Sequence, residues 1–176
     1  PDCKIYGFEP VESLFNRAIH KVKGYDRVVI EKKALGHESG HKEMHISYKK
    51  GKVYGSSSLL EPKDHLRDHP KITFNNTETV ETVSLDDWIR ENGIDCIDLA
   101  WLDMQGYEPV LLQNSPLAVS KINFLYTEVS TVETYKSVMQ YGDYKDFLLG
   151  NGFEVVHEGV YWKDGGNVLF RKMVDI

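Results

Sequence analysis

The sequence predicts an α/β fold with a mostly parallel sheet, helices on both faces and a C-terminal antiparallel hairpin. Apolar, β-branched runs alternate along the chain with segments whose apolar residues recur at helical spacing. Glycine or proline separates most of these segments, and two short strand-like runs close the chain. The 176 residues suffice for one sizeable core, so we expect a single domain over residues 1–176.

The first half of the chain is predicted to hold four strands and two helices. A helix is expected over residues 11–22, where apolar side chains recur on one face. The second helix is the segment LDDWIREN, which Ser84 or Asp86 can cap and Gly93 ends. Residues 49–76 are polar and rich in glycine, and they are expected to form a long binding loop. The predicted strands are 4–8, 27–35, 41–48 and 79–85.

The second half is predicted to alternate strands and helices before the final hairpin. The strand over 96–104 has little polar alternation, which is expected of a strand covered on both faces. A helix follows in YEPVLLQNS, with Pro109 tolerated in its first turn. A further strand over 121–129 precedes a helix in YGDYKDFLLGNG. The segments FEVVHEG and NVLFRKM can then pair as an antiparallel hairpin.

Composition and charge narrow the class of protein. The net charge of −6 argues against binding to nucleic acid or to a membrane surface, because such proteins carry a basic footprint. No apolar run reaches the length needed to cross a bilayer. Cys3 and Cys96 are interpreted as reduced residues of a cytoplasmic protein. The oligomeric state stays open, a homo-oligomer included.

Acidic residues follow several predicted strands, and ligands of α/β sheets bind at the carboxyl ends of the strands. Glu9 could accept hydrogen bonds from a ribose diol, or it could be a solvated acid at the start of a helix. Asp103 could serve a site, or it could cap the helix that begins near Tyr107. Glu128 is expected to share a crevice with Asp103, where like charges raise the pKa of one carboxyl group.

Several common site motifs are absent from the sequence. It contains no GxGxxG turn, no phosphate-binding loop and no GxSxG nucleophile motif. Two groups of histidines have metal-like spacing, but neither group lies on a predicted helix, so no metal is expected. These groups are His37, His41 and His45, and His65 and His69.

Four segments, in this order and spacing, resemble the FkbM family of S-adenosylmethionine-dependent methyltransferases. They are YGFEPV, ALG, TVSLDDWIRENGIDCIDLAWLDMQGYEPVLL and FLYTEVS, and the resemblance runs over nearly the whole chain. Two positions depart from the family pattern. Trp101 stands where the family usually has lysine, and Gln105 stands where it usually has glutamate. We interpret W-x-D-x-Q-G as a variant of the motif, and any role of the missing lysine or glutamate is in doubt.

The resemblance implies a Rossmann-like methyltransferase fold with S-adenosylmethionine as cofactor. It implies that Glu9 binds the ribose hydroxyls, and that Ala34 and Leu35 line the adenine side. Asp103 would lie near the methionine moiety and the transferred methyl, where it could orient or deprotonate an acceptor hydroxyl.

The resemblance also implies an acceptor side and a reaction. Catalytic candidates besides Asp103 are Gln105 and Glu128, with Glu108 nearby. The implied reaction is O-methylation of a hydroxyl on a glycan or small metabolite. We expect residues 49–76 to set the acceptor preference.

In this fold class the first strand, with its glycine-rich turn, precedes the segment that begins here at Pro1. We therefore expect an N-terminally truncated methyltransferase domain whose sheet has two unpaired inner edges. The alternatives are that another chain supplies a strand or that the two edges meet directly. Three other hypotheses about the class of protein stay open. They are a non-catalytic Rossmann-like module that has lost cofactor binding, a nicotinamide-dependent enzyme that uses Glu9, and a structural α/β domain.

Overall fold

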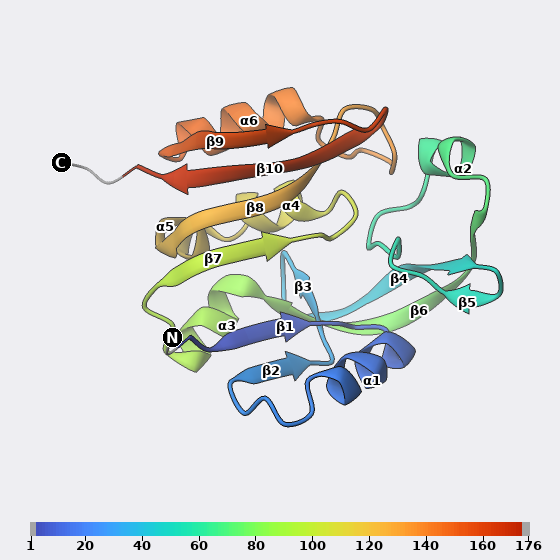
Figure 1. Cartoon of the computed structure of the whole chain (residues 1–176), viewed down its shortest axis with the longest axis horizontal. Coiled ribbons are helices and arrows are strands. Elements are labelled where there is room, and N and C mark those ends of the chain that lie inside the picture. Colours follow the sequence, from blue (N-terminus) through green and yellow to red (C-terminus); the bar gives the residue numbers. More distant parts are fainter. Residues whose placement is uncertain (1–2, 174–176) are drawn as a thin grey trace.

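The structure is a computed structural model that describes residues 3–173. It is an α/β fold whose strands form three sheets (Figure 1). One sheet pairs β1 (Ile5–Phe8) with β2 (Val28–Glu31). The second has the order β7 (Ile97–Leu102), β8 (Ile122–Ser130), β10 (Gly165–Lys172), β9 (Phe153–Gly159). The third has the order β3 (Ala34–Gly36), β6 (Ile72–Ser84), β4 (Gly40–Lys49), β5 (Lys52–Val53).

The strand pairing is mixed, which corrects the prediction of a mostly parallel sheet. The pairs β1·β2, β3·β6 and β7·β8 are parallel. Strand β4 instead folds back antiparallel on β6, and β10 lies antiparallel between β8 and β9. The predicted C-terminal hairpin is confirmed by the pairing of β9 with β10.

Two predicted segments divide differently in the structure. The strand expected over 27–35 becomes β2 and β3, which belong to separate sheets. The loop expected over 49–76 contains β5, the short helix α2 (Asp64–Asp68) and the start of β6. Strand β6 is longer than predicted because its polar first half pairs with β4, so its backbone is bonded although its side chains are exposed.

The remaining helices largely follow the sequence pattern. They are α1 (Glu12–Lys21), α3 (Leu85–Asn92), α4 (Glu108–Gln113), α5 (Pro116–Lys121) and α6 (Tyr141–Gly150). The Ser84 hydroxyl caps α3 by accepting from the Asp87 N–H, and Gly93 ends it with a φ of 60°. Helix α5 was not predicted. Its first N–H groups are satisfied from another helix, because buried Asp86 accepts from Leu117 and Ala118.

The main core lies between the β7–β8–β10–β9 sheet and helices α3 to α6. Its fully buried members include Leu111, Leu125, Leu148 and Phe170. Figure 1 shows α3, α4 and α5 behind the strands of this view. The outer face of β7 is open, since Trp101 is 71% exposed. The prediction that this strand is covered on both faces is therefore wrong.

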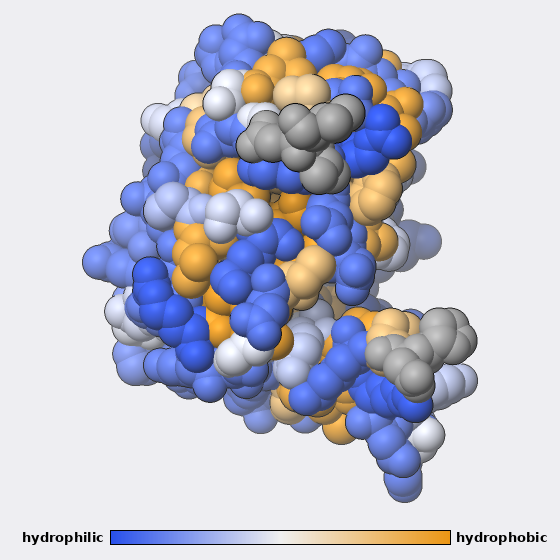
Figure 2. Space-filling model, turned by 90° about the vertical axis from the view of Figure 1, so that its left-hand side faces the viewer, coloured by the Kyte–Doolittle hydropathy of each residue, from blue (hydrophilic) through white to orange (hydrophobic). Residues whose placement is uncertain are grey.

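Strands β1 and β7 each have an edge that lacks a hydrogen-bonded neighbour among the described strands. Exposed apolar side chains, including Ile5 and Leu99, lie on these strands. Figure 2 looks onto the side where both strands begin and shows apolar residues gathered in its middle. In residues 3–173, no helix has the length and apolar character needed to span a bilayer.

Candidate functional site

The register of two parallel strands brings the site together. Leu102 of β7 is the register partner of Thr127 of β8, so the next residues, Asp103 and Glu128, emerge side by side at the carboxyl end of the sheet. The chain then turns sharply through Gly106, whose φ of 91° favours glycine. A Cβ at this position would lie 2.8 Å from a methyl carbon of Val138, so the turn has room only for glycine.

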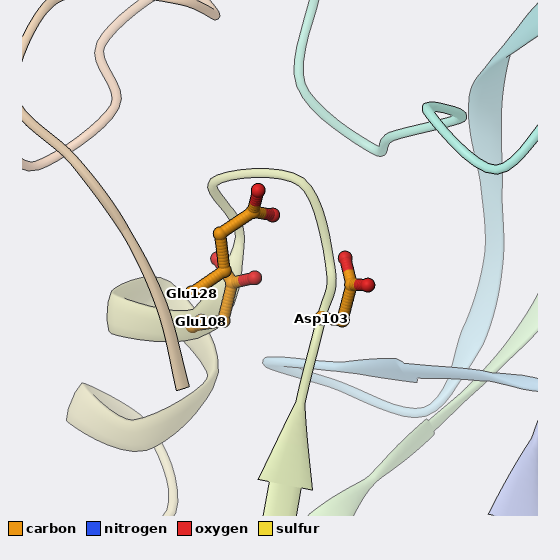
Figure 3. Close-up of side chains that lie close together, drawn as sticks. All are labelled: Asp103, Glu108 and Glu128. Carbon is orange, nitrogen blue, oxygen red and sulfur yellow. The ribbon is translucent and has the colours of Figure 1, made fainter. Parts of the chain in front are cut away.

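The turn folds the start of α4 back over the strand end and adds a third acid. Carboxylate oxygens of Asp103, Glu108 and Glu128 all lie within 4.8 Å of one another. Figure 3 shows Glu108 and Glu128 together on one side of the turn and Asp103 on the other. The sequence pattern had offered Asp103 as a helix cap, but the N-cap of α4 is Tyr107.

Gln105 connects the acids. Its amide nitrogen donates to Asp103 Oδ1 and to Glu128 Oε2, each at 2.8 Å. Its amide oxygen accepts from the Tyr135 hydroxyl at 3.3 Å, and its main-chain carbonyl accepts from the Ser58 hydroxyl at 2.9 Å. These contacts fix a residue whose φ of 55° lies in the left-handed region.

Burial changes the protonation of two of these acids. Burial, followed by the charges of Glu108 and Asp103, raises the pKa of Glu128 to about 9. Burial also raises the pKa of Glu108 to about 7, although main-chain N–H donors, that of Met104 among them, oppose the shift. The expectation that one carboxyl of the cluster has a raised pKa is confirmed, with desolvation as the larger cause. At neutral pH, Glu128 is a neutral hydrogen-bond donor.

The three acids have the spacing of cation ligands, and each of them also accepts a hydrogen bond from the protein. The Gln105 amide donates to Asp103 and Glu128, and Glu108 accepts from the main chain.

A first cavity, of about 220 Å³, opens between the carboxyl ends of β1 and β7. All four predicted cofactor-binding residues line it: Glu9, Ala34, Leu35 and Asp103. Glu9 Oε1 accepts from the Val11 N–H at 2.9 Å, and burial raises the pKa of this carboxyl group. Apolar walls beside one carboxylate suit a nucleoside, because its base can pack against the walls while its ribose diol donates hydrogen bonds to the carboxylate.

A second cavity, of about 550 Å³, lies on the other side of the Gln105 turn. Gln105 and Glu128 line it, whereas Asp103 lines the first cavity. Six residues of the predicted binding loop also contribute to its wall: Lys49, Tyr54, Ser56, His65, His69 and Ile72. The loop between β9 and β10 closes it with residues 162–164, together with Gly165 at the start of β10.

Two further groups complete this site, and neither was predicted from the sequence. Tyr135, 2% exposed, donates its hydroxyl proton to the Ser56 carbonyl at 2.8 Å and shares it with the Gln105 amide oxygen at 3.3 Å. Asp164 reaches the second cavity from the hairpin loop. Glu9, Asp103 and Glu128 were predicted because each lies at the carboxyl end of a predicted strand. Tyr135 and Asp164 do not directly follow a predicted strand, so the same criterion could not identify them.

Comparison with known proteins identifies this domain as a methyltransferase. The chain belongs to the FkbM methyltransferase family, because the model of the Methyltransferase FkbM domain matches residues 1–155. The chain is 31% identical to the 2-O-methyltransferase NoeI of Sinorhizobium fredii (strain NBRC 101917 / NGR234) over 159 residues. That match covers 89% of this chain and 65% of the relative, so the chain spans about two thirds of NoeI.

A solved structure shares the fold. The crystal structure of the methyltransferase FkbM from Methylobacillus flagellatus KT superposes with a TM-score of 0.51 at 15% sequence identity. The match covers 96% of this chain and 36% of that chain.

Proposed function

We propose that this domain binds S-adenosylmethionine in the first cavity and transfers its methyl group to a hydroxyl in the second cavity. The acceptor class we propose is a glycan or a small metabolite. One observation carries the proposal: the Asp103–Gln105–Glu128 unit lies at the carboxyl ends of two parallel strands and separates two cavities of different character. Family membership supports methyl transfer as the reaction class.

The first cavity offers matching chemistry for each part of the cofactor. Within residues 3–173, the Val11 N–H donates to Glu9 Oε1, and no residue donates to Oε2. Glu9 Oε2 can therefore accept a hydrogen bond from a ribose hydroxyl. Ala34 and Leu35 supply an apolar wall for the adenine ring. S-adenosylmethionine supplies an electrophilic methyl group on a positively charged sulfur, and the exposed carboxylate of Asp103 suits that charge.

The second cavity offers groups that could hold an acceptor hydroxyl. A protonated Glu128 can donate a hydrogen bond, and the Gln105 turn aligns it with the strand end. Alignment is the main requirement of a methyl transfer, which is an in-line displacement at carbon. Residues 49–76 form much of this wall, so we propose that they select the acceptor.

A methyl-transfer assay tests the proposal. The full-length protein is incubated with methyl-labelled S-adenosylmethionine and a panel of methyl glycosides and polyols, and label in the acceptors is measured. We expect transfer that is lost in Asp103→Asn, with Asp98→Asn as a control on the exposed surface of the same strand. No label in any hydroxyl acceptor, or undiminished transfer by Asp103→Asn, would contradict the proposal.

A further inference from the structure

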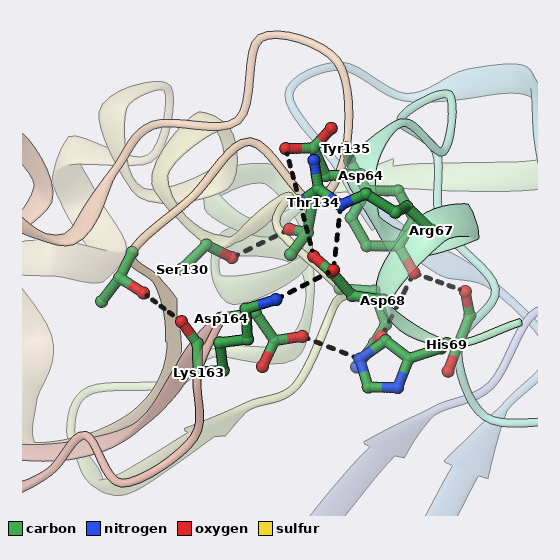
Figure 4. Close-up of polar contacts among 12 residues, drawn as sticks. Asp64, Arg67, Asp68, His69, Ser130, Thr134, Tyr135, Lys163 and Asp164 are labelled. Carbon is green, nitrogen blue, oxygen red and sulfur yellow. Dashed lines mark hydrogen bonds and ion pairs between the residues drawn. The ribbon is translucent and has the colours of Figure 1, made fainter.

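A histidine–aspartate pair lies in the wall of the second cavity, opposite the Gln105 turn. His69 follows helix α2, and Asp164 lies in the loop between β9 and β10. His69 Nε2 is 2.7 Å from Asp164 Oδ2 (Figure 4). Both residues line the second cavity.

The aspartate orients the histidine. A carboxylate only accepts hydrogen bonds, so the ring nitrogen that faces Asp164 carries the proton. The other nitrogen, Nδ1, then has a free lone pair. This is the arrangement in which an aspartate holds a histidine ready to accept a proton. The Asp164 side chain is 17% exposed, so surrounding residues restrict its movement.

Packing ties this pair to the acids of the site. The His65 ring contacts the His69 ring with centroids 4.6 Å apart and planes tilted by 39°, and it also contacts the Tyr135 ring at 5.4 Å. Tyr135 in turn donates to Gln105. Burial lowers the pKa of His65 to about 4, so His65 stays neutral beside His69. Asp164 is also close enough to Glu128 for its charge to contribute to the raised pKa of that residue.

The three acids of the strand-end cluster are poorly suited to remove a proton from a molecule in the second cavity. Glu128 already holds its proton at neutral pH. Glu108 is 1% exposed and accepts from the main chain, so an acceptor cannot reach it. Asp103 faces the first cavity and accepts from Gln105. His65 also lines this wall, but burial lowers its pKa to about 4 and makes it a weak base. Of the two histidines, His69 is the one whose ring an aspartate orients.

We propose that His69 is the general base of the reaction and that Asp164 is its positioning residue. The inference rests on the proposed function, methyl transfer to a hydroxyl. The acceptor O–H bond breaks and its proton goes to His69 Nδ1. The oxygen then forms the bond to the methyl carbon, and the electrons of the carbon–sulfur bond stay on sulfur, which becomes a neutral thioether. The product is the methyl ether, and the imidazolium later returns the proton to water.

Charged and titratable groups from several elements lie around the second cavity or contact the residues beside His69. They are His65, Arg67 and Asp68 of α2, Lys163 and Asp164 of the hairpin loop, Lys49 at the end of β4 and Glu128 of β8.

The test compares three variants of the full-length protein: His69→Gln, Asp164→Asn and the control Leu66→Gln. Leu66 is 47% exposed on the same short helix and is not among the residues that line the second cavity. We measure kcat and KM for whichever methyl glycoside or polyol the wild type methylates fastest. His69→Gln should lower kcat about 100-fold or more, as expected for loss of a general base. The KM should change little, whereas Leu66→Gln should match the wild type.

A second readout needs no acceptor. Nitrogen-15 NMR of the histidines at pH 8 should show His69 protonated at Nε2, and Asp164→Asn should shift that tautomer. Wild-type turnover by His69→Gln, or a His69 proton on Nδ1, would overturn the inference. If the proposed function itself is wrong, the wild type will neither methylate these probes nor bind S-adenosylhomocysteine. The His69 tautomer can be measured even then, so it tests the pairing with Asp164 separately.

Discussion

The side-chain amide of Gln105 donates a hydrogen bond to the carboxyl group of Glu128 across 2.8 Å. The same nitrogen donates to Asp103, so one neutral residue holds two acids in place. A glutamate, the usual residue at this position of the motif that the chain resembles, only accepts hydrogen bonds when it is ionised. The variant motif therefore fits an acidic cluster that depends on a donor at its centre.

Gln105→Glu should destabilise the fold by about 1–3 kcal/mol, because it removes two donors and adds a carboxylate among three others. Chemical denaturation monitored by circular dichroism measures the change. Gln113→Glu, near the exposed end of α4, is the matched control and should change stability by less than about 0.5 kcal/mol.

The double variant Gln105→Glu/Glu128→Gln should recover part of that loss. The amide that Glu128→Gln introduces can donate to the new carboxylate, which restores one donor–acceptor pair. A coupling energy of at least about 0.5 kcal/mol is expected for residues in contact. Strictly additive effects of the two substitutions would argue that the observed hydrogen bond has no energetic weight.

The raised pKa of Glu128 predicts a pH dependence of stability. The unfolded chain releases this proton near pH 4.5, whereas the folded protein holds it until about pH 9. The unfolded state therefore binds fewer protons across this window, and the free energy of unfolding falls as the pH rises. Glu128→Gln should make the slope shallower by up to about 1.4 kcal/mol per pH unit. Denaturation curves between pH 5 and 9 measure it, and Glu43→Gln, on an exposed part of β4, should leave the slope unchanged.

Tyr135→Phe should weaken turnover through Gln105. Without the hydroxyl, the Gln105 amide loses the contact that orients it, and the Ser56 carbonyl loses its donor. We expect kcat to fall about tenfold, the effect of losing about 1.4 kcal/mol of hydrogen bonding. Tyr144→Phe is the control: this tyrosine is equally buried, but its hydroxyl pairs with Thr127. Equal losses of kcat in both variants would show a general effect on folding.

Asp86→Ala should be costly for stability. Its buried carboxylate accepts from two N–H groups at the start of α5, at 3.0 and 2.8 Å, and so joins α3 to α5. Losing both bonds should cost about 2–4 kcal/mol in thermal or chemical unfolding. The neighbouring Asp87→Ala removes only an exposed ion pair with Arg90 and a weak contact with Ser39, and should cost about 1 kcal/mol or less.

The ends of three strands can be predicted because neighbouring residues in the sequence mark them. Apolar runs mark β1, β7 and β8, and an acid at the end of each run marks Glu9, Asp103 and Glu128. The structure places the first two in one cavity and the third in the adjoining one.

Long-range pairing explains what the sequence did not show. Residues 72–78 look like a polar loop, yet they form strand because β4 supplies hydrogen-bond partners. Tyr135 lies 30 residues from Gln105 in sequence, and Asp164 lies 95 residues from His69, so only the tertiary fold brings each pair together. No local pattern distinguishes such residues from other polar side chains in loops.

Calorimetric titration of S-adenosylhomocysteine into the full-length protein tests the central claim most directly. Glu9→Gln is compared with Glu12→Gln, an exposed acid of α1 that pairs with Lys32. We predict that the wild type and Glu12→Gln bind with equal strength. The Kd of Glu9→Gln should be about 10–100-fold higher, because this variant loses charge-assisted hydrogen bonds to the ribose diol. Binding of equal strength by all three proteins, or no binding by the wild type, would contradict it.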